Sequence, residues 1–256
     1  MNPSVAIITG ASQGIGRATA IRLANDFKSV VLVARNEEAL QQTAKSVTTA
    51  GATPLVLALD LRRPEAARTV VTKTLERFGQ IDALLNIAGA VPQITLLEMT
   101  DEQWDDGLAL KLHGARRLTI QAWEALKQSK GSVVFMSGNS AELPKPPYAA
   151  VGTINAAIVV MAKAFSEQGI KDGVQVNSVL PGPVLTHRRE TYLEKYAAAH
   201  KMTVEEAMQK FPAQAGITRY GQPEEIANLM AFLVSPAAKW MTGSAVRMDG
   251  GEIKGV

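Results

Sequence analysis

Three glycines separate an apolar segment from a helical one near the start of the chain. Residues 9–16 read Thr-Gly-Ala-Ser-Gln-Gly-Ile-Gly, follow the apolar residues 5–8, and lead into apolar residues at helical spacing. A strand, a tight turn and a helix in this order point backbone N–H groups and the positive end of a helix at an anion, and glycine lets the backbone approach it. The spacing of Gly10, Gly14 and Gly16 predicts a phosphate site, although a tight turn with small residues for packing fits the same pattern.

The composition narrows the class of protein. The chain has 256 residues, enough for a sizeable core, and no Cys, which excludes thiolate chemistry and fits a cytoplasmic protein. The chain has 27 Lys and Arg residues against 24 Asp and Glu residues, and its basic residues are scattered along the sequence. We therefore expect no nucleic-acid partner. No apolar run approaches the roughly 18 residues that cross a bilayer, so we expect no membrane partner. The three His residues are not grouped with metal spacing, and we expect no metal.

Apolar runs alternate with helical periodicity along the chain. The pattern predicts strands at residues 5–9, 29–34, 54–59, 81–86, 132–137, 173–179 and 244–248, and helices at residues 15–25, 37–50, 65–78, 101–128, 148–168 and 224–233. This alternation indicates an α/β fold with a doubly wound parallel sheet and helices on both faces. A single domain over residues 1–256 is the simplest organisation. Residues 186–220 break the rhythm and are predicted to form a mostly helical flap over the carboxyl edge of the sheet.

The chain resembles the short-chain dehydrogenase/reductase family over almost its whole length. The matching motifs are TGASQGIG at residues 9–16, Asp60 after the third predicted strand, NIAG at residues 86–89, Tyr148 at the head of a long helix, NSVLPGPVLT at residues 177–186, and the ending at residues 221–251. The resemblance implies a Rossmann-type seven-stranded sheet, a nicotinamide cofactor, a small-molecule carbonyl or alcohol substrate, and a homodimer or homotetramer joined through long helices.

The end of the second predicted strand bears on the choice of cofactor. A carboxylate there would hold the adenosine ribose hydroxyls and repel a 2′-phosphate, whereas this chain has Ala34 followed by Arg35. A guanidinium pairs with a phosphate in a forked geometry and the Ser12 hydroxyl adds a donor, so we predict NADP(H) in preference to NAD(H). A solvated Arg35 that opens the next helix is the alternative. The resemblance implies further cofactor contacts at Gly10, Gln13, Gly14, Ile15, Gly16, Asp60, Leu61, Asn86, Ala88, Gly89, Tyr148, Pro181, Gly182, Val184 and Thr186.

Three of these cofactor positions also have structural interpretations. Asp60 is suited to capping the turn into the next helix, and Asn86 to tying neighbouring strands together. The Pro-Gly-Pro sequence at residues 181–183 fits a rigid loop as well as it fits a segment that holds the nicotinamide amide.

Most of the family's active-site pattern is missing. Its usual members are a Tyr that moves the carbonyl-side proton, a Lys one helical turn later that lowers the pKa of the Tyr and binds the ribose, a Ser that orients the carbonyl oxygen, and an Asn that holds a water relay. This chain keeps Tyr148 but has Gly152 at the Lys position, Gly138 at the Ser position and Lys111 at the Asn position. The departures therefore concern the chemistry more than the fold.

Lys111 and Gly152 suggest a relocated cation. We expect a Lys stem at the Asn position to face the catalytic centre and to reach the space that Gly152 leaves beside Tyr148, where its ammonium would lower the pKa of Tyr148 or bind the ribose. The alternative is a Lys111 that extends to solvent from a helix flank. Ser137 and Ser140 are candidates to replace the missing Ser, and both are also suited to bonding local backbone, which we favour for Ser140.

The predicted flap is rich in basic and aromatic residues, among them His187, Arg188, Arg189, Tyr192 and Tyr196. A cationic mouth would favour a substrate with a carboxylate or phosphate. Surface residues on an amphipathic lid helix are the favoured interpretation.

Three functions are compatible with these features. An NADP(H)-dependent oxidoreductase acting on a carbonyl/alcohol pair, with Tyr148, Lys111 and Ser137 as its catalytic residues, is the leading one. A cofactor-binding protein that has lost catalysis and serves as a sensor or structural partner is the first alternative. A non-redox enzyme on the same scaffold is the second, because fold alone does not choose among them.

Overall fold

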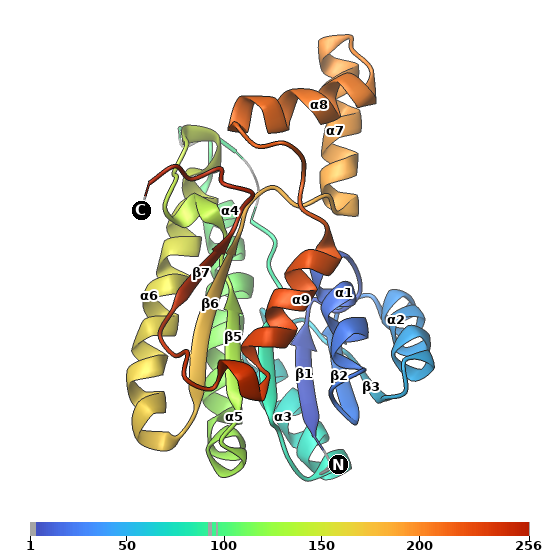
Figure 1. Ribbon diagram of the computed structural model, residues 1–256, viewed down its shortest axis with the longest axis vertical. Helices are drawn as coiled ribbons and strands as arrows, with labels where there is room; N and C mark the ends of the chain where they lie inside the picture. The colour runs from blue at the N-terminus through green and yellow to red at the C-terminus, as the bar shows by residue number, and fades with distance from the viewer. Residues whose placement is uncertain (1–3, 92–93, 96, 256) are drawn as a thin grey trace.

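Seven parallel strands form one sheet through the middle of the protein (Figure 1). The computed structural model describes residues 4–91, 94–95 and 97–255. The sheet order is β3-β2-β1-β4-β5-β6-β7, so the chain winds outward from β1 in both directions, as predicted for a doubly wound Rossmann-type fold. The strands are β1 (Val5–Thr9), β2 (Ser29–Ala34), β3 (Thr53–Ala58), β4 (Ala83–Asn86), β5 (Ser132–Met136), β6 (Gln175–Pro181) and β7 (Ala245–Met248).

Helices cover both faces of the sheet. One face packs against α1 (Gly14–Leu23), α2 (Glu37–Thr49) and α9 (Pro223–Leu233). The other face packs against α3 (Pro64–Phe78), α5 (Ala115–Ser129) and α6 (Ala149–Asp172). Shorter elements are α4 (Asp101–Gly107), the π-helical turn η1 (Leu108–Gly114) and the 3-10 turns η2 (Asn139–Ala141), η3 (Pro146–Tyr148) and η4 (Pro236–Ala238).

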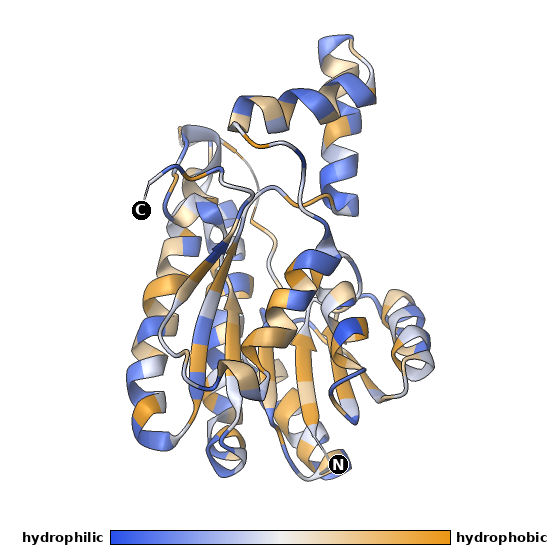
Figure 2. Ribbon diagram, viewed as in Figure 1, coloured by the Kyte–Doolittle hydropathy of each residue, from blue (hydrophilic) through white to orange (hydrophobic). Residues whose placement is uncertain are grey.

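The alternation of side chains along each strand divides the core into two layers. In β1, Ala6 and Ile8 join the cluster under α1 and α9, whereas Val5 and Ile7 join the cluster under α3 and α5. All four are buried, and β1 is coloured mainly orange, for hydrophobic residues, in Figure 2. Burial of each large side chain stabilises the fold by roughly 1.5–3 kcal/mol, so the sheet is a rigid base for the loops at its carboxyl edge.

The predicted helix at residues 101–128 is interrupted in the structure. α4 ends at Gly107, and η1 widens the backbone to a π-helix before α5 begins at Ala115. Such a turn displaces the side chains that follow it and often lies at a functional site. Periodicity alone does not reveal this change, and η1 carries Lys111.

Helix α6 is long and apolar. Together with η3 it spans Pro146–Asp172, and it is the one helix among the described residues whose length and composition would suffice to cross a membrane. The core helix of a soluble protein meets the same criteria, so this is weak evidence for a membrane span. Ile158 and Ala162 of α6 are buried in the core layer that also contains α5.

Two helices stand above the carboxyl edge of the sheet (Figure 1). They are α7 (His187–His200) and α8 (Val204–Ala215), and they occupy most of the segment predicted to be a flap. Tyr196 packs edge-on against Phe211 with 4.8 Å between ring centroids, which joins α7 to α8. A parallel bridge between Val184 and Gly221 closes the base of this flap.

Candidate active site

The glycine turn is shaped to receive an anion. Gly10 and Gly14 have φ values of +69° and +53°, which favour glycine, and a Cβ on Gly16 would lie 2.1 Å from the carbonyl oxygen of Gly10. The first turn of α1 has no acidic residue, and its N-cap Gln13 makes no side-chain cap. The turn therefore leaves backbone donors and the positive helix end available, which fits the pyrophosphate of a dinucleotide.

Two distant segments meet at this turn. A Cβ on Gly14 would lie 3.4 Å from the methyl group of Thr186, which places the start of α7 beside the glycine turn. A Cβ on Gly10 would lie 3.1 Å from Cα of Ala88, so the segment after β4 also approaches closely. The Thr9 hydroxyl accepts hydrogen bonds from the backbone N–H groups of Ile87 and Ala88 at 2.8 and 2.9 Å. The predicted cofactor segments are thus assembled at one edge of the sheet.

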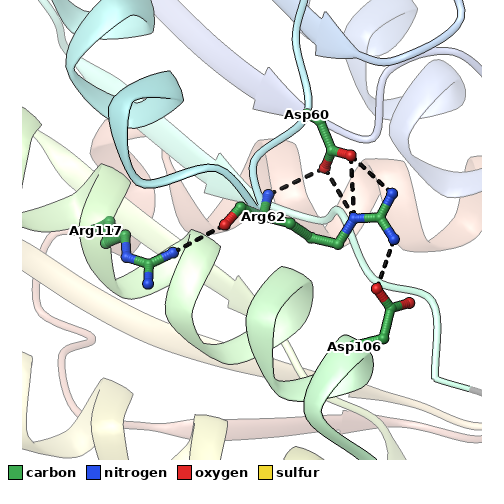
Figure 3. A network of polar contacts seen from close by, with 4 residues as sticks. All are labelled: Asp60, Arg62, Asp106 and Arg117. Atoms are coloured by element: carbon green, nitrogen blue, oxygen red, sulfur yellow. Dashed lines mark hydrogen bonds and ion pairs between the residues drawn. The ribbon is translucent and has the colours of Figure 1, made fainter. Parts of the chain in front are cut away.

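Asp60 takes part in a charged network rather than standing alone (Figure 3). Its carboxylate forms an ion pair with Arg62 at 2.7 Å and accepts the backbone N–H of Arg62 at 3.1 Å. Arg62 also pairs with Asp106 at 2.6 Å, and Arg117 donates to the Arg62 carbonyl oxygen at 3.2 Å. The hydrogen bond from the Arg62 guanidinium keeps the pKa of Asp60 below its usual value. The network fixes the turn after β3, which carries the buried Leu61, against α4.

Asn86 and Arg35 lie in contrasting surroundings. Asn86 is buried at the end of β4, and its Nδ2 donates to Thr119 Oγ1 at 3.0 Å, so it ties β4 to α5. Its Oδ1 is buried without a hydrogen-bond partner among the described residues. Arg35 follows β2 and is exposed, as is expected of a residue that pairs with a ligand or with solvent. Ser12, in the glycine turn, is half-buried.

A cavity of about 910 Å³ opens between the sheet edge and the flap. Lys111 from η1, Ser137 after β5, Tyr148 at the start of α6 and Arg189 from α7 contribute to its wall. The cavity also brings in the predicted cofactor residues Ile15, Gly89, Pro181, Gly182, Val184 and Thr186. The remaining predicted cofactor residues, Gly10, Ser12, Gln13, Gly14, Gly16, Arg35, Asp60, Leu61, Asn86 and Ala88, lie outside this lining. The wall therefore combines residues of the segment predicted to hold the nicotinamide with the candidate catalytic side chains.

Lys111 is held at the bottom of this cavity by two acceptors. Its Nζ donates to the carbonyl oxygen of Ser137 at 3.2 Å and makes a very short contact with Oδ1 of Asn155. Its stem passes over Gly89, where a Cβ would lie 2.9 Å from Cδ of Lys111. Burial, together with the charge of Arg188, lowers the pKa of Lys111 to about 8. At neutral pH this residue is an ammonium close to the point of releasing its proton.

The predicted contact between Lys111 and the space at Gly152 is wrong. A Cβ on Gly152 would lie 2.8 Å from the carbonyl oxygen of Ser140, so backbone already fills that space. Lys111 reaches Asn155 instead, three residues further along α6. Nor does it extend to solvent, because both of its hydrogen-bond partners lie within the protein.

The segment after β5 is organised around Asn155. The Ser137 hydroxyl donates to the Asn155 carbonyl oxygen at 2.8 Å, and the Asn155 Nδ2 donates to the Ser140 hydroxyl at 2.8 Å. A Cβ on Gly138 would lie 2.7 Å from Nδ2 of Asn155, so a Ser at that position would collide with the amide. Gly138, which stands where the resemblance implies a Ser, is thus physically linked to the presence of Asn155.

Tyr148 lies at the other side of the cavity, next to the flap. It is half-buried and interacts with Tyr192 of α7. Burial, assisted by the interaction with Tyr148, raises the pKa of Tyr192. Among the described residues, no hydrogen bond joins Tyr148 to Lys111. The two candidate proton carriers therefore approach the cavity from different walls.

Asn155 and Tyr220 are site residues that the sequence did not single out. Asn155 follows Tyr148 by seven residues, and Val151 by four, so a helical wheel drawn from Tyr148 places all three on one face of α6. All three line the cavity, whereas Gly152 does not. Tyr220 lies outside regular structure, and nothing in its local sequence indicates that it returns to the cavity.

The chain matches known proteins over nearly its full length. Residues 10–252 match a family model described as enoyl-(acyl carrier protein) reductase. A putative ketoacyl reductase from Streptomyces coelicolor is 32% identical over 253 residues, covering 96% of each chain. The L-sorbose reductase of Gluconobacter frateurii, solved with NADPH and L-sorbose, has a TM-score of 0.96 at 30% identity, covering 100% of this chain and 98% of that one. A short-chain dehydrogenase/reductase from Serratia marcescens, solved as a mutant, has a TM-score of 0.86 at 28% identity, covering 97% of each chain.

Proposed function

The chain belongs to the short-chain dehydrogenase/reductase family, and on that premise we propose that it is an NADP(H)-dependent oxidoreductase acting on a carbonyl/alcohol pair. The observation that carries the proposal is the shared cavity. Its lining includes Pro181, Gly182, Val184 and Thr186, which we expect to hold the nicotinamide, together with Lys111, Ser137 and Tyr148. A carbonyl group in this cavity would meet hydrogen-bond donors from the chain on two sides.

The cofactor is expected across the carboxyl edge of the sheet. The residues proposed to hold the pyrophosphate are those of the glycine turn, from Gly10 to Gly16, and Asn86, Ala88 and Gly89 border the path to the cavity. Arg35 is exposed at the end of β2 and is proposed to pair with the 2′-phosphate. NADPH, when bound, supplies the hydride. The preference for NADP(H) over NAD(H) rests on Arg35 and on the absence of a carboxylate at Ala34.

Lys111 is the proposed proton donor to the substrate oxygen. Two of its three N–H groups are directed to Ser137 and Asn155, which leaves one for a ligand in the cavity. A pKa of about 8 is close to the value at which a general acid works best near neutral pH. Tyr148 would supply a second donor from the opposite wall, and Ser137 would position Lys111 through its carbonyl oxygen.

The test is a titration followed by a turnover assay. Purified protein is titrated with NADPH and with NADH while nicotinamide fluorescence is recorded, and the NADPH-loaded protein is then given a panel of ketones and aldehydes. The proposal is supported if NADPH binds and its absorbance then falls as a ketone or aldehyde is reduced, with a kcat on the order of 1–10³ per second. Binding without turnover on any carbonyl would favour a sensor or structural partner. Product formation without loss of absorbance would favour a non-redox enzyme.

We further expect a cytoplasmic homodimer or homotetramer. α5 and α6 expose the apolar side chains Ile120, Val160 and Ile170, of which Val160 is 70% exposed, and pairing of long helices would cover them. Light scattering on the purified protein gives the mass directly. A monomer at micromolar concentration would contradict this expectation.

A further inference from the structure

The flap wall of the cavity is strongly cationic. Arg188, Arg189 and Lys195 all line it from α7, and Lys111 lies at the bottom. Among the described lining residues the only carboxylate is Glu252, which pairs at 3.6 Å with Lys145, another lining residue. The ion pairs among the described residues include none with Arg188, Arg189 or Lys195. Four positive charges therefore face one cavity with little internal compensation.

Arg189 lies among phenol groups. Its guanidinium is 5.5 Å from the ring centroid of Tyr192, and its charge acts on Tyr220. Tyr220 is 5% exposed, and its hydroxyl is buried without a hydrogen-bond partner among the described residues. A buried polar group of this kind is normally paired, by a ligand or by water where the protein offers nothing. A guanidinium and nearby phenols are the donors that bind a carboxylate or phosphate.

Arg188 and Arg189 differ in their contacts with the protein. Its Nη2 donates to the carbonyl oxygen of Val91 at 2.9 Å, so it connects the flap to the segment after β4. One part of its guanidinium is thus committed to protein. Arg189 makes no side-chain hydrogen bond with the described residues, and its neighbours Tyr192 and Tyr220 line the same cavity as Tyr148 and Lys111.

We propose that the substrate of this site carries an oxyanion, a carboxylate or a phosphate, that Arg189 binds together with the Tyr192 and Tyr220 hydroxyls while the substrate carbonyl faces Lys111. This inference rests on the proposed function and narrows its substrate class. The other source of the same chemistry is the cofactor, whose phosphates would then be the groups that Arg189 contacts. The two sources make different predictions for the affinity of Arg189→Ala for NADPH: it falls if Arg189 contacts the cofactor, and it is unchanged if Arg189 binds the substrate.

Matched pairs of ketones test the proposal. The NADPH-loaded protein is assayed with 4-oxopentanoate and its methyl ester, and with dihydroxyacetone phosphate and dihydroxyacetone. We expect at least a tenfold higher kcat/KM for the anion in one pair, and the responding pair distinguishes carboxylate from phosphate. In Arg189→Ala this preference disappears, because kcat/KM falls at least tenfold more for the anion than for the neutral member. Lys210→Ala removes a charge from α8 outside the cavity lining and keeps the preference.

Three results would overturn the inference. A wild-type protein that prefers the neutral member of both pairs would do so, as would equal loss of both members in Arg189→Ala. A tenfold weaker affinity for NADPH in Arg189→Ala, measured by fluorescence titration, would assign the guanidinium to the cofactor.

If the protein reduces none of these ketones, a binding experiment separates the oxyanion inference from the proposed redox function. Ligand-observed NMR on the NADPH-loaded protein then compares binding of the two members of each pair. Arg189-dependent binding of the anion supports the inference while the redox proposal fails. Equal binding, or none, overturns the inference as well.

Discussion

The glycine turn and the cavity beside it depend on different parts of the chain, backbone in the first and side chains in the second. Gly10, Gly14 and Gly16 form a turn that is predicted to bind an anion through backbone N–H groups. Gly16 has no room for a Cβ, and Gly10 and Gly14 have positive φ values that favour glycine. On the β5–α6 side, the contacts are made by long side chains that reach between elements, as Lys111 does to Asn155. The glycine turn carries the motif on which the resemblance rests, whereas the cavity wall is where the sequence predicts that three of the four usual active-site residues are replaced.

The difference shows which kind of site a sequence can predict. A backbone site depends on φ values and close approach, which only certain residue types allow, so residue type and spacing are informative. A side-chain site depends on which residues meet, and the meeting point is set by tertiary geometry. A pattern that has changed on one helix can therefore be compensated on another without any local signal.

Substitution of Lys111 is expected to have the largest effect on catalytic activity. We expect Lys111→Met to lower kcat for carbonyl reduction by about 10³-fold, because the cavity loses its proposed proton donor. The melting temperature and the affinity for NADPH should stay close to the wild-type values. Full retained turnover in this variant would show that Tyr148 alone moves the proton.

The pH dependence of kcat also tests whether Lys111 is the proton donor. The pKa of Lys111 is about 8, and the acid form is the one that donates. The reductive kcat should thus be flat below this value and fall as pH rises through it, whereas the residual activity of Lys111→Met should lack that limb. As a rescue, Lys111→Asn combined with Asn155→Lys exchanges the two partners across their contact, and we expect at least tenfold more activity than in Lys111→Asn alone.

Substitution of Gly152 tests the interpretation that the structure corrects. We expect Gly152→Lys to lower the free energy of unfolding by about 2–3 kcal/mol, because its Cβ would lie 2.8 Å from the Ser140 carbonyl oxygen and α6 or η2 must shift. Chemical denaturation measures the change. Thr153→Lys, at the next and exposed residue, is the matched control and should stay within about 0.5 kcal/mol of wild type. A stable and more active Gly152→Lys would show that the Lys position is open after all.

The sequence predicts more of the fold than of the candidate site. The order of strands and helices, and most of their bounds to within a few residues, follow from apolar periodicity, since each buried strand must be apolar on both faces. The break at η1 does not, because a π-helical turn keeps the same residue types. The sequence pattern predicts Tyr148 and Lys111 as site residues but not Asn155, because the family's Tyr–Lys spacing points to the residue four after Tyr148 and not to the one seven after it.

Loss of Arg35 tests the cofactor side with a smaller effect. We expect Arg35→Ala to weaken NADPH binding by about 10- to 100-fold, the value of one charge-assisted pairing, and to leave NADH binding within twofold. Fluorescence titration gives both constants. Arg77→Ala, in the last turn of α3, removes the same charge far from the glycine turn and should change neither. Equal weakening of both nucleotides would mean that Arg35 supports the fold of the turn and does not read the 2′-phosphate.

The charged network around Asp60 gives the smallest expected effect, and it separates stability from binding on the cofactor side. Arg62 pairs with Asp60 and Asp106, but all three side chains keep substantial contact with solvent, so Arg62→Ala should cost only about 0.5–1 kcal/mol in the free energy of unfolding. The pKa of Asp60 is lowered in the folded protein, so its contribution is complete above about pH 4 and is lost as pH falls through the folded value. Denaturation curves at about pH 7 and about pH 3 should therefore converge for wild type and Arg62→Ala at the lower pH. If NADPH affinity also falls more than tenfold in this variant, the turn after β3 is a cofactor contact that depends on side chains, and the contrast between the backbone-built cofactor region and the side-chain-built cavity becomes weaker.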